Sequence, residues 1–279
     1  MKSSLEQDLK MNSLSAGSGK PVVMVHGSYG SLQDFKMSIF DRVSERYRAV
    51  AVDMPGHGLS GRSKPVMTLE EHAEALHVFF ADSGIEKPLL VGHSWGGAVT
   101  LAYAVKYPKE VSGIVFLGAY VVPYERLEMI YRVTTTPVLG DLFVRLLVRP
   151  ITRLTDPTVF IKKTFYPNEV SEAYAKTAVA LATEPESFKF NAQDVKLNLG
   201  PDLAALQPRY SQIRVPVLIV TGDTDSVAPA ERHAYPLHRM ITQSKLIVLP
   251  GTGHHPAFSQ PDEVVRLIDM TWDDAEVGR

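Results

Sequence analysis

The 279-residue chain contains no cysteine. That absence excludes disulfide bonds, a thiolate nucleophile, and zinc or iron–sulfur sites held by cysteine. An excess of one charge is also missing, because 29 Lys and Arg residues are balanced by 31 Asp and Glu residues. Proteins that bind nucleic acid or anionic membranes through their overall charge are usually basic. We therefore expect no nucleic-acid partner.

Long apolar runs are lacking as well. No stretch reaches the roughly 18 residues of a membrane-spanning helix, and Met1–Lys10 is too polar for a secretory signal peptide. We expect a cytoplasmic protein without a transmembrane segment, unless a targeting or anchor segment once preceded Met1. At 45% hydrophobic residues, the composition suits a globular protein with a large core.

Short apolar runs alternate with helical patterns in two parts of the chain. Several runs lack polar alternation, which is typical of parallel strands covered on both faces. A capping box at Thr68 begins one helix, and Gly84 ends it. Such alternation predicts an α/β fold with a mainly parallel sheet flanked by helices. The predicted strands are Pro21–Val25, Tyr47–Asp53, Pro88–Val91, Val111–Leu117, Val215–Thr221 and Lys245–Leu249.

The alternation stops between about Tyr120 and Tyr210, where prolines interrupt helical patterns and no strand is evident. Because long loops without secondary structure are uncommon, we expect a helical cap at residues 120–210, inserted between two strands. The core would then consist of residues 20–119 and 211–279. Residues 1–19 would form a reduced hairpin or a disordered segment.

The segment Gly92–Gly97 reads Gly-His-Ser-Trp-Gly-Gly and matches the pattern G-x-S-x-G. It lies between a predicted strand and the helical pattern Ala98–Tyr107. A turn this sharp leaves no room for side chains two residues before and after the serine, which suits Gly92 and Gly96. The turn would present the Ser94 hydroxyl at a helix N-terminus, where N–H groups and the helix dipole favour negative charge. Ser94 is therefore the candidate nucleophile.

A serine nucleophile needs a base, and the base needs an orienting carboxylate. His254 and His255 follow the last predicted strand, and Asp223 and Asp225 follow the strand before it. Because catalytic groups gather at the carboxyl ends of parallel strands, the serine, an aspartate and a histidine would meet at one edge of the sheet. The residues themselves leave two candidates for each of the last two roles.

Two backbone N–H groups are needed to stabilise the oxyanion. One belongs to Trp95, the residue after the nucleophile, and the other is expected from the loop after the first apolar strand. That loop, His26–Gly30, contains Gly27, which permits a close backbone approach. We predict the N–H of Ser28 as the second donor.

At these motifs the chain resembles the α/β-hydrolase superfamily, over residues 20–268 outside the insertion. The resemblance implies an α/β-hydrolase fold with Ser94 as the nucleophile. It favours Asp225 over Asp223, because Asp225 lies three residues after a glycine and four before a proline, as the family's acid does. The family's Gly-x-Gly-His motif assigns the base to His254.

The segment Gly92–Gly97 is also similar to the capped branch that includes epoxide hydrolases, haloalkane dehalogenases and haloperoxidase-like members. In the first two groups the motif carries Asp where this chain has Ser94. An aspartate nucleophile forms an alkyl ester that water cleaves, whereas a serine attacking an alkyl halide or epoxide would form an ether. Ser94 therefore indicates acyl chemistry. The turn Asp53–Ser60 matches another family motif, in which we expect Asp53 to be structural.

Apolar residues recur at helical spacing within the predicted cap. We expect them to bury one face of a lid helix over the pocket or, alternatively, to meet a lipid surface or a partner. The predicted substrate contacts are Tyr29, Tyr120 and Phe143, since aromatic side chains there could line an acyl pocket. The lid residues are Val138, Leu139, Leu142, Phe143, Leu146, Leu147 and Ile151.

Other histidines fit structural roles better than metal binding. His72 and His77, like His233 and His238, are five residues apart, whereas helical zinc pairs are four apart. We expect these four to be surface or half-buried residues. His93, beside the serine, is expected to pack under the turn.

The sequence therefore predicts a cofactor-independent serine hydrolase with no metal. Its expected substrate is an uncharged small-molecule ester, lactone or thioester with small to medium apolar groups, and carboxylic-ester hydrolysis is the leading expectation. Carbon–carbon bond hydrolysis, amide hydrolysis and perhydrolysis would use the same triad. A ligand-binding receptor or pseudoenzyme on this fold is the alternative of another class.

Overall fold

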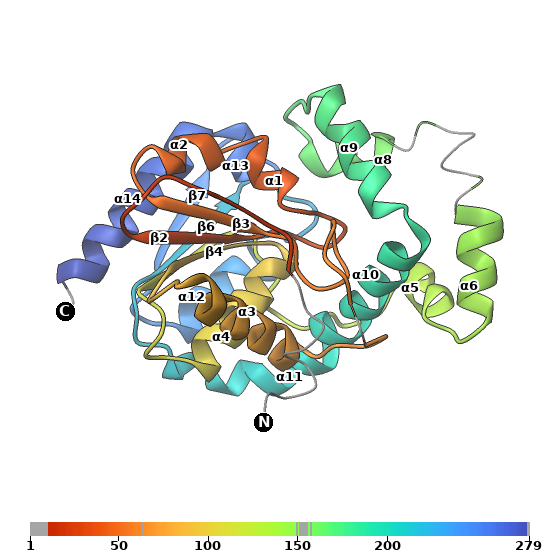
Figure 1. Ribbon diagram of the computed structural model, residues 1–279, viewed down its shortest axis with the longest axis horizontal. Coiled ribbons are helices and arrows are strands. Elements are labelled where there is room, and N and C mark those ends of the chain that lie inside the picture. The colour runs from red at the N-terminus through yellow and green to blue at the C-terminus, as the bar shows by residue number, and fades with distance from the viewer. Residues whose placement is uncertain (1–10, 63, 149, 151–155, 157, 278–279) are drawn as a thin grey trace.

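The computed structural model describes residues 11–62, 64–148, 150, 156 and 158–277. These residues form a seven-stranded sheet with helices on both faces (Figure 1). The strand order is β1-β3-β2-β4-β5-β6-β7, in which β1 pairs antiparallel with β3 and the other pairings are parallel. The strands are β1 (Ser13–Ala16), β2 (Pro21–Val25), β3 (Arg48–Val52), β4 (Leu89–His93), β5 (Gly113–Leu117), β6 (Val217–Gly222) and β7 (Lys245–Leu249).

The central strands are buried along their whole length, which explains their unbroken apolar sequences. In the register of the sheet, Val25 of β2 lies opposite Gly92 of β4, and His93 lies opposite Leu117 of β5. The carboxyl ends of these three strands are therefore level. Loops that follow them meet at a single edge, where catalytic groups are expected in this type of sheet.

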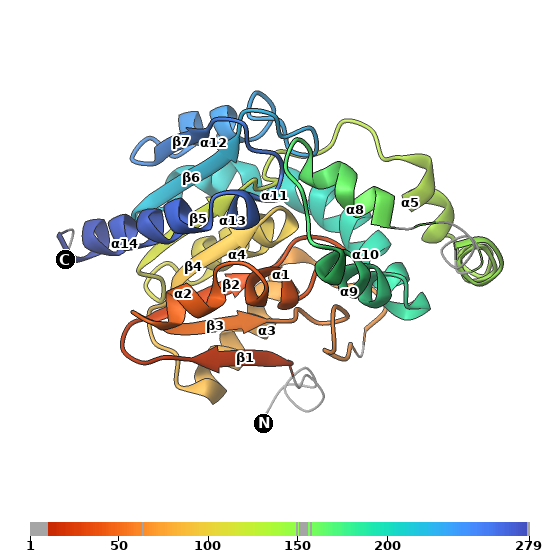
Figure 2. The same ribbon diagram turned by 90° about the horizontal axis from the view of Figure 1, so that it is seen from above.

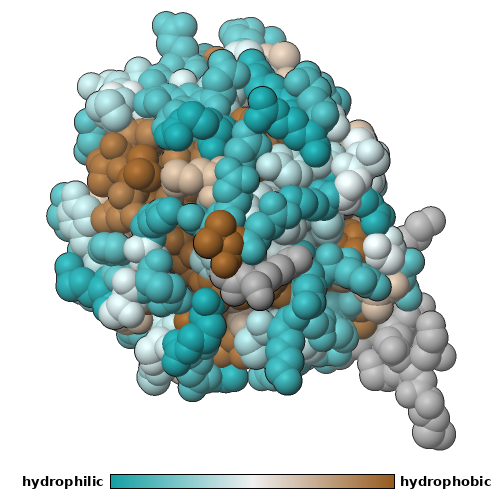
Figure 3. Space-filling view, turned by 90° about the vertical axis from the view of Figure 1, so that its left-hand side faces the viewer, coloured by the Kyte–Doolittle hydropathy of each residue, from teal (hydrophilic) through white to brown (hydrophobic). Residues whose placement is uncertain are grey.

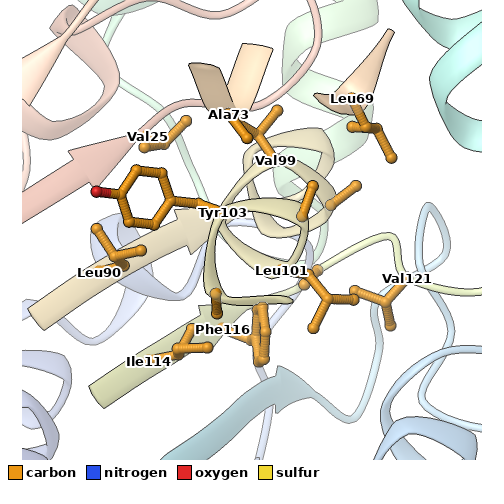
Figure 4. Packing of buried hydrophobic residues seen from close by; sticks show 14 of the residues in the cluster. Val25, Leu69, Ala73, Leu90, Val99, Leu101, Tyr103, Ile114, Phe116 and Val121 are labelled. Carbon is orange, nitrogen blue, oxygen red and sulfur yellow. The ribbon is translucent and has the colours of Figure 1, made fainter. Parts of the chain in front are cut away.

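Two helical layers bury the faces of the sheet. On one face α4 lies across the strands, and its Val99, Leu101 and Tyr103 pack with Ile114 and Phe116 of β5 (Figure 4). Helices α3 and α12 share that face, and α1, α2, α13 and α14 cover the other (Figure 1). Their bounds are α1 Gln33–Lys36, α2 Phe40–Ser44, α3 Leu69–Ser83, α4 Trp95–Lys106, α12 Ala234–Met240, α13 Pro256–Ser259 and α14 Pro261–Val277.

A helical cap is inserted between β5 and β6. Its helices α5 to α10 lie beyond the carboxyl edge of the sheet (Figures 1 and 2), and η3 returns along α4 towards β6. The cap helices are α5 (Met129–Thr134), α6 (Leu139–Phe143), η1 (Val144–Val148), α8 (Thr158–Phe165), α9 (Glu172–Ala182), α10 (Pro185–Leu197), η2 (Asn198–Asp202), α11 (Leu203–Leu206) and η3 (Gln207–Gln212).

The six predicted strands are all present. Two have the predicted bounds, and the ends of the other four differ by at most two residues. The capping box at Thr68 is formed, and Gly84 ends α3 in the left-handed conformation. Of the first nineteen residues the structure describes residues 11–19, and these contribute strand β1, which pairs with β3. Asp53 is structural as expected, because its Oδ1 accepts the Leu32 N–H at 2.7 Å and its Oδ2 accepts the Leu59 N–H at 2.9 Å.

Candidate active site

Ser94 occupies a sharp turn between β4 and α4. Its backbone angles, φ 50° and ψ −120°, are strained for a residue with a side chain. A Cβ at Gly92 would lie 2.5 Å from Thr100 Oγ1, and one at Gly96 would lie 2.3 Å from the Val25 carbonyl oxygen. Close packing of the turn therefore demands glycine at both positions of the motif.

Hydrogen bonds from the next strand and the first residues of the cap hold the Ser94 backbone. Its N–H donates to the carbonyl oxygen of Leu117 at 3.1 Å, and its carbonyl oxygen accepts the N–H of Tyr120 at 3.0 Å. Strained backbone persists when its surroundings determine it in this way. The residue is 9% exposed, so its surroundings largely cover the candidate nucleophile.

His254 and Asp225 meet after the ends of β7 and β6. Nδ1 of His254 lies 2.8 Å from Oδ2 of Asp225, and Oδ1 of Asp225 accepts the N–H groups of Val227 and Ala228, each at 2.8 Å. Burial disfavours the carboxylate, but His254 and the two N–H groups outweigh it, so the pKa of Asp225 lies below its ordinary value. A charged Asp225 keeps the His254 proton on Nδ1.

The neighbouring candidates, Asp223 and His255, make other contacts within the fold. Oδ1 of Asp223 accepts the Thr252 N–H at 3.3 Å. The His255 ring stacks on Phe165 with 3.9 Å between centroids, and its Nε2 lies 3.0 Å from Thr164 Oγ1. Burial holds the pKa of His255 well below its ordinary value. These contacts are consistent with the family-based preference for the other member of each pair.

Gly118 lies against the aspartate–histidine pair and was not singled out from the sequence. Its φ is 51°, and its N–H donates to Val220 of β6 at 2.9 Å. A Cβ there would lie 3.0 Å from the His254 carbonyl oxygen and 3.2 Å from Asp225 Oδ2. Because Gly118 has no side chain, the backbone that follows β5 can pass close to both His254 and Asp225.

The loop after β2 passes beside the nucleophile. A Cβ at Gly27 would lie 3.0 Å from the Cβ of Ser94, so the loop backbone approaches closely, as we predicted for Gly27. Tyr29 is left-handed with φ 58°, and its N–H donates to Oδ1 of Asn191 on the cap helix α10. Ser28 lies between these two fixed points.

Trp95 is the first residue of α4, where backbone N–H groups have no partner within the helix. Its indole is fully buried, stacks on His57 with 4.8 Å between ring centroids, and donates from Nε1 to Oδ1 of Asn198 at 3.1 Å. The backbone of Trp95, at the start of α4, and the loop after β2 that contains Ser28 therefore both lie close to Ser94. Their use as oxyanion donors stays a prediction.

The three predicted substrate contacts are placed differently. The Tyr29 ring lies 5.3 Å from that of Phe188 on α10. Tyr120 directly adjoins the nucleophile through its backbone, and its ring lies 4.0 Å from that of His233. Phe143 belongs to α6 in the outer part of the cap (Figure 1). The structure therefore brings Tyr29 and Tyr120 to the candidate site and places Phe143 in the outer cap.

The apolar lid residues do not bury the face that we expected them to bury. Five of the seven have exposed fractions from 50% to 79%, and Phe143 is half-buried. Helices α6 and η1, which carry most of them, pack on α5 and α10. The exposed residues are Val138, Leu139, Leu142, Leu146 and Leu147, and we call this set the lid face. Ile151 lies outside the described residues.

Two of the paired histidines are also placed differently from our expectation. His72 and His233 are buried, whereas His77 and His238 are half-buried. His72 is buried because it lies against Asp194 of the cap, with 3.5 Å between Nε2 and Oδ2. Among the residues that the structure describes, no group of three or more His, Asp or Glu side chains could hold a metal ion.

A polar face on α10 was missed by sequence reasoning. Asn191, Asp194 and Asn198 recur at spacings of three and four, which places them on one side of the helix and its continuation η2. All three are buried against the core. The sequence signal for this face was three polar residues at helical spacing, at positions where a helix that packs on a core normally has apolar residues.

Two cavities lie in the cap. One of about 420 Å³ is lined by Glu125, Arg126, Leu127, Arg132 and Lys196. The other, of about 270 Å³, lies between η1 and α10 and includes Arg62, Arg145 and Phe190 in its lining. The residues of the candidate triad line neither of these two cavities, in keeping with the low exposure of Ser94.

Comparison with known proteins decides the family. The profile of the alpha/beta hydrolase family matches residues 22–267. The chain belongs to this family. It has a mostly parallel sheet with a helical insertion, and it is a hydrolase.

Two curated relatives and one solved structure illustrate the likeness to other alpha/beta hydrolases. A proline iminopeptidase from Xylella fastidiosa is 27% identical, covering 91% of this chain and 88% of the relative. A 2-hydroxy-6-oxo-6-phenylhexa-2,4-dienoate hydrolase from Comamonas testosteroni is 26% identical, covering 90% and 87%. A putative aryl esterase from Burkholderia cenocepacia has the same fold, with a TM-score of 0.78, 21% identity and 96% of both chains covered.

In the part of the chain that the structure describes, no helix of this alpha/beta hydrolase is both long and apolar enough to cross a bilayer.

Proposed function

We propose that this alpha/beta hydrolase is a serine esterase that cleaves small to medium apolar carboxylic esters through an acyl-enzyme on Ser94. The observation that carries the proposal is the 2.8 Å contact between His254 and Asp225, at the same sheet edge as the strained turn that bears Ser94. A serine in such a turn, with a histidine oriented by a buried carboxylate, is the arrangement that activates a hydroxyl for acyl transfer.

In the proposed reaction, the Ser94 hydroxyl oxygen attacks the ester carbonyl carbon. Nδ1 of His254 is engaged by Asp225, so Nε2 is the nitrogen that takes the hydroxyl proton. The same nitrogen then delivers the proton to the leaving alcohol. Water attacks the acyl-enzyme in the second half-reaction, with His254 again acting as base. Asp225 stabilises the imidazolium in both steps.

The oxyanion would be stabilised by the N–H groups of Trp95 and Ser28. Trp95 offers a donor at the start of α4, and Ser28 lies in the loop that contacts Ser94 through Gly27. Loss of one such donor costs about 3 kcal/mol of transition-state stabilisation. The ester preference is supported by the aromatic rings of Tyr29, Phe188 and Tyr120 near these donors, which suit an uncharged apolar group.

The test is covalent labelling with a fluorophosphonate, followed by peptide mass spectrometry. Wild type should be labelled at Ser94, and Ser94→Ala should not be labelled. The same preparations are assayed on nitrophenyl esters of increasing acyl length, which measures the acyl pocket. Lactone, amide, dienoate and hydrogen-peroxide assays distinguish the other reactions open to the same triad. Folded wild type that is neither labelled nor active would overturn the proposal in favour of a ligand-binding protein on this fold.

A second proposal concerns the lid face, which we propose docks on an anionic lipid surface. Five large apolar side chains there are at least half exposed. By contrast, hydrophilic residues cover much of the opposite side of the molecule, with apolar patches between them (Figure 3). Exposed apolar clusters of this kind mark interaction surfaces more often than ordinary surface.

Charge complementarity favours a lipid surface as the occupant. Residues 129–165 carry six Lys and Arg residues and two Asp residues, a net charge of +4, whereas the whole chain has −2 and the remainder therefore −6. Arg132, Arg145, Lys162 and Lys163 of this segment are exposed. Basic side chains next to exposed leucines suit binding at an anionic interface.

Sedimentation with vesicles tests this second proposal. Wild type should sediment with phosphatidylglycerol vesicles at low salt and much less with phosphatidylcholine vesicles. The double variant Leu142→Ser/Leu146→Ser should lose binding, while Val277→Ser, which alters an even more exposed apolar residue at the end of α14, should retain it. Absence of binding by wild type would contradict the proposal. So would concentration-dependent dimerisation that the double variant abolishes, because it would assign the lid face to a second copy of the chain.

A further inference from the structure

We propose that the cap helix α10 sets the geometry of the oxyanion hole, with Asn191 as a positioning residue for the loop that contains Ser28. The inference rests on the proposed function, because it gives a catalytic consequence to a contact between the cap and that loop. It goes beyond the triad, since Asn191 lies 162 positions along the chain from its partner Tyr29 and touches none of the reacting groups assigned above.

The Asn191 side chain is oriented by its own helix. It is 1% exposed, and its Nδ2 donates to the Ser187 carbonyl oxygen, one turn earlier, at 2.8 Å. With the amide nitrogen so engaged, Oδ1 points away from the helix and accepts the N–H of Tyr29. An asparagine amide has separate donor and acceptor ends, so one bond determines the direction of the other.

The loop that receives this contact has a conformation that needs support. Tyr29 has a φ of 58°, which is costly for a residue with a side chain. Two residues earlier, the backbone runs so close to Ser94 that a Cβ at Gly27 would lie 3.0 Å from the Ser94 Cβ. Ser28 therefore lies between Gly27, which is packed close to Ser94, and Tyr29, which is hydrogen-bonded to the cap. Without the hydrogen bond from Tyr29 to Asn191, the direction of the Ser28 N–H would be free to change.

The contact between α10 and the core is buried and polar. Asp194 accepts two hydrogen bonds from Arg62 Nη1, each at 2.9 Å, and lies 3.0 Å from Nε2 of His57. Burial opposes its charge, but His72, His57 and Arg62 outweigh this, and the pKa of Asp194 lies below its ordinary value. A buried ion pair holds only in one geometry, because displacement would leave charges without partners.

The polar face of α10 and η2 also contacts Trp95, the other predicted oxyanion donor. Asn198, seven residues after Asn191, accepts the indole N–H of Trp95 at 3.1 Å, and its own Nδ2 donates to the Met67 carbonyl oxygen at 2.9 Å. The cap therefore contacts Trp95, one of the proposed oxyanion donors, and Tyr29, the residue that follows the other proposed donor, Ser28. We infer that the hole is complete only when α10 is seated on the core.

The experiment compares Asn191→Leu with Tyr124→Phe. The control removes a hydrogen bond of 2.8 Å from Tyr124 to the Lys196 carbonyl on the same helix, away from the oxyanion loop. Because the donor is displaced rather than removed, Asn191→Leu should lower kcat on a nitrophenyl ester about tenfold and leave KM within about threefold. Affinity for a boronic acid, which forms a tetrahedral adduct on the serine, should fall in parallel. Tyr124→Phe should change none of these values more than twofold.

Hydrogen–deuterium exchange supplies a readout that does not depend on turnover. Exchange in the peptide spanning residues 27–32 should accelerate in Asn191→Leu and stay unchanged in Tyr124→Phe. Asn191→Ala adds no bulk and serves as the second variant if the leucine is not accommodated, with the same expected result. An unchanged kcat with unchanged exchange overturns the inference, and so does a loss confined to KM. If wild type itself lacks labelling and turnover, the proposed function fails, while exchange still tests the contact.

Discussion

His93 donates a hydrogen bond from Nε2 to the carbonyl oxygen of His254, at 2.9 Å. A carbonyl oxygen only accepts, so His93 must carry its proton on Nε2. The residue before the nucleophile thus holds the backbone of the proposed base, and its ring lies 4.9 Å from that of His254. Burial, together with His254, lowers the pKa of His93 to about 3. His93 is therefore a neutral structural donor, consistent with the packed role expected for it.

The first prediction follows from that donor. His93→Gln retains an N–H near the position of Nε2, whereas His93→Leu removes it. We expect the leucine variant to lose about 10-fold to 100-fold in kcat on a nitrophenyl ester, because a displaced base transfers protons poorly. The glutamine variant should lose less than about fivefold. Equal losses in the two variants would show that ring packing, rather than the hydrogen bond, positions His254.

The second prediction separates the two aspartates that follow β6. Asp225→Asn should lower kcat about 10,000-fold with little change in KM, because an amide cannot hold His254 in the reactive tautomer or balance its positive charge. Asp223→Asn should retain most of the activity, because Asp223 contacts the Thr252 N–H at 3.3 Å and not the histidine. Steady-state kinetics on both variants, with circular dichroism to check folding, decides between them. A larger loss in Asp223→Asn would reverse the assignment.

The third prediction compares two glycines with similar backbones. Gly118 has φ 51° and Gly84 has φ 59°, so alanine at either position should cost about 1 to 2 kcal/mol of unfolding free energy. A Cβ at Gly84 meets no atom within 4 Å, whereas one at Gly118 meets His254 and Asp225. We therefore expect Gly118→Ala alone to lower kcat. Denaturation curves and kinetics measured side by side test this, and full activity in Gly118→Ala would show that the triad tolerates the contact.

The fourth prediction concerns stability and pH. Burial raises the pKa of Asp34 from 3.8 to about 7, despite the Tyr174 hydroxyl that donates to its Oδ1 at 3.0 Å. Below pH 4 the carboxyl is neutral in both states, so it makes no difference to folding. Between pH 4 and 7 the unfolded chain releases this proton and the folded chain keeps it. The free energy of unfolding should therefore fall as pH rises through this window.

Asp34→Asn removes the ionisation. Relative to wild type, its unfolding free energy should rise between pH 4 and pH 8 by roughly 4 kcal/mol, at about 1.4 kcal/mol for each unit of pKa shift. Tyr174→Phe should act in the opposite sense and steepen the decline, because it deprives the carboxylate of a donor. Urea denaturation at four pH values measures both. A difference between Asp34→Asn and wild type that does not change with pH would contradict the prediction.

Several features were readable from the sequence because local spacing determines them. Gly92 is needed because of atoms in the turn and in α4, since a Cβ there would lie 2.5 Å from Thr100 Oγ1 and 2.7 Å from the Gly96 carbonyl oxygen. Apolar runs without alternation identified the buried strands, since parallel strands are covered on both faces. The capping box at Thr68 depends on residues three apart. Such signals do not require knowledge of distant contacts.

Other features depend on partners that are remote in the chain. His57 and Asp194 are 137 positions apart, and Tyr29 and Asn191 are 162 apart. His72 was expected near the surface, because its own helix gives no sign that a cap carboxylate will cover it. The lid face reads as an ordinary apolar helix face, and only the position of α6 at the outside of the cap exposes it.

The amino-acid sequence by itself determined where six of the strands lie along the chain, the sharp turn at Ser94 and the residue types that follow β6 and β7, because backbone sterics and hydrophobic periodicity act over a few residues. The tertiary structure alone decided how Asn191 reaches Tyr29, beside Ser28, how His72 comes to lie against Asp194, and which leucines are exposed. These outcomes depend on how separate elements pack, and packing is a property of surfaces that the linear order of residues does not contain.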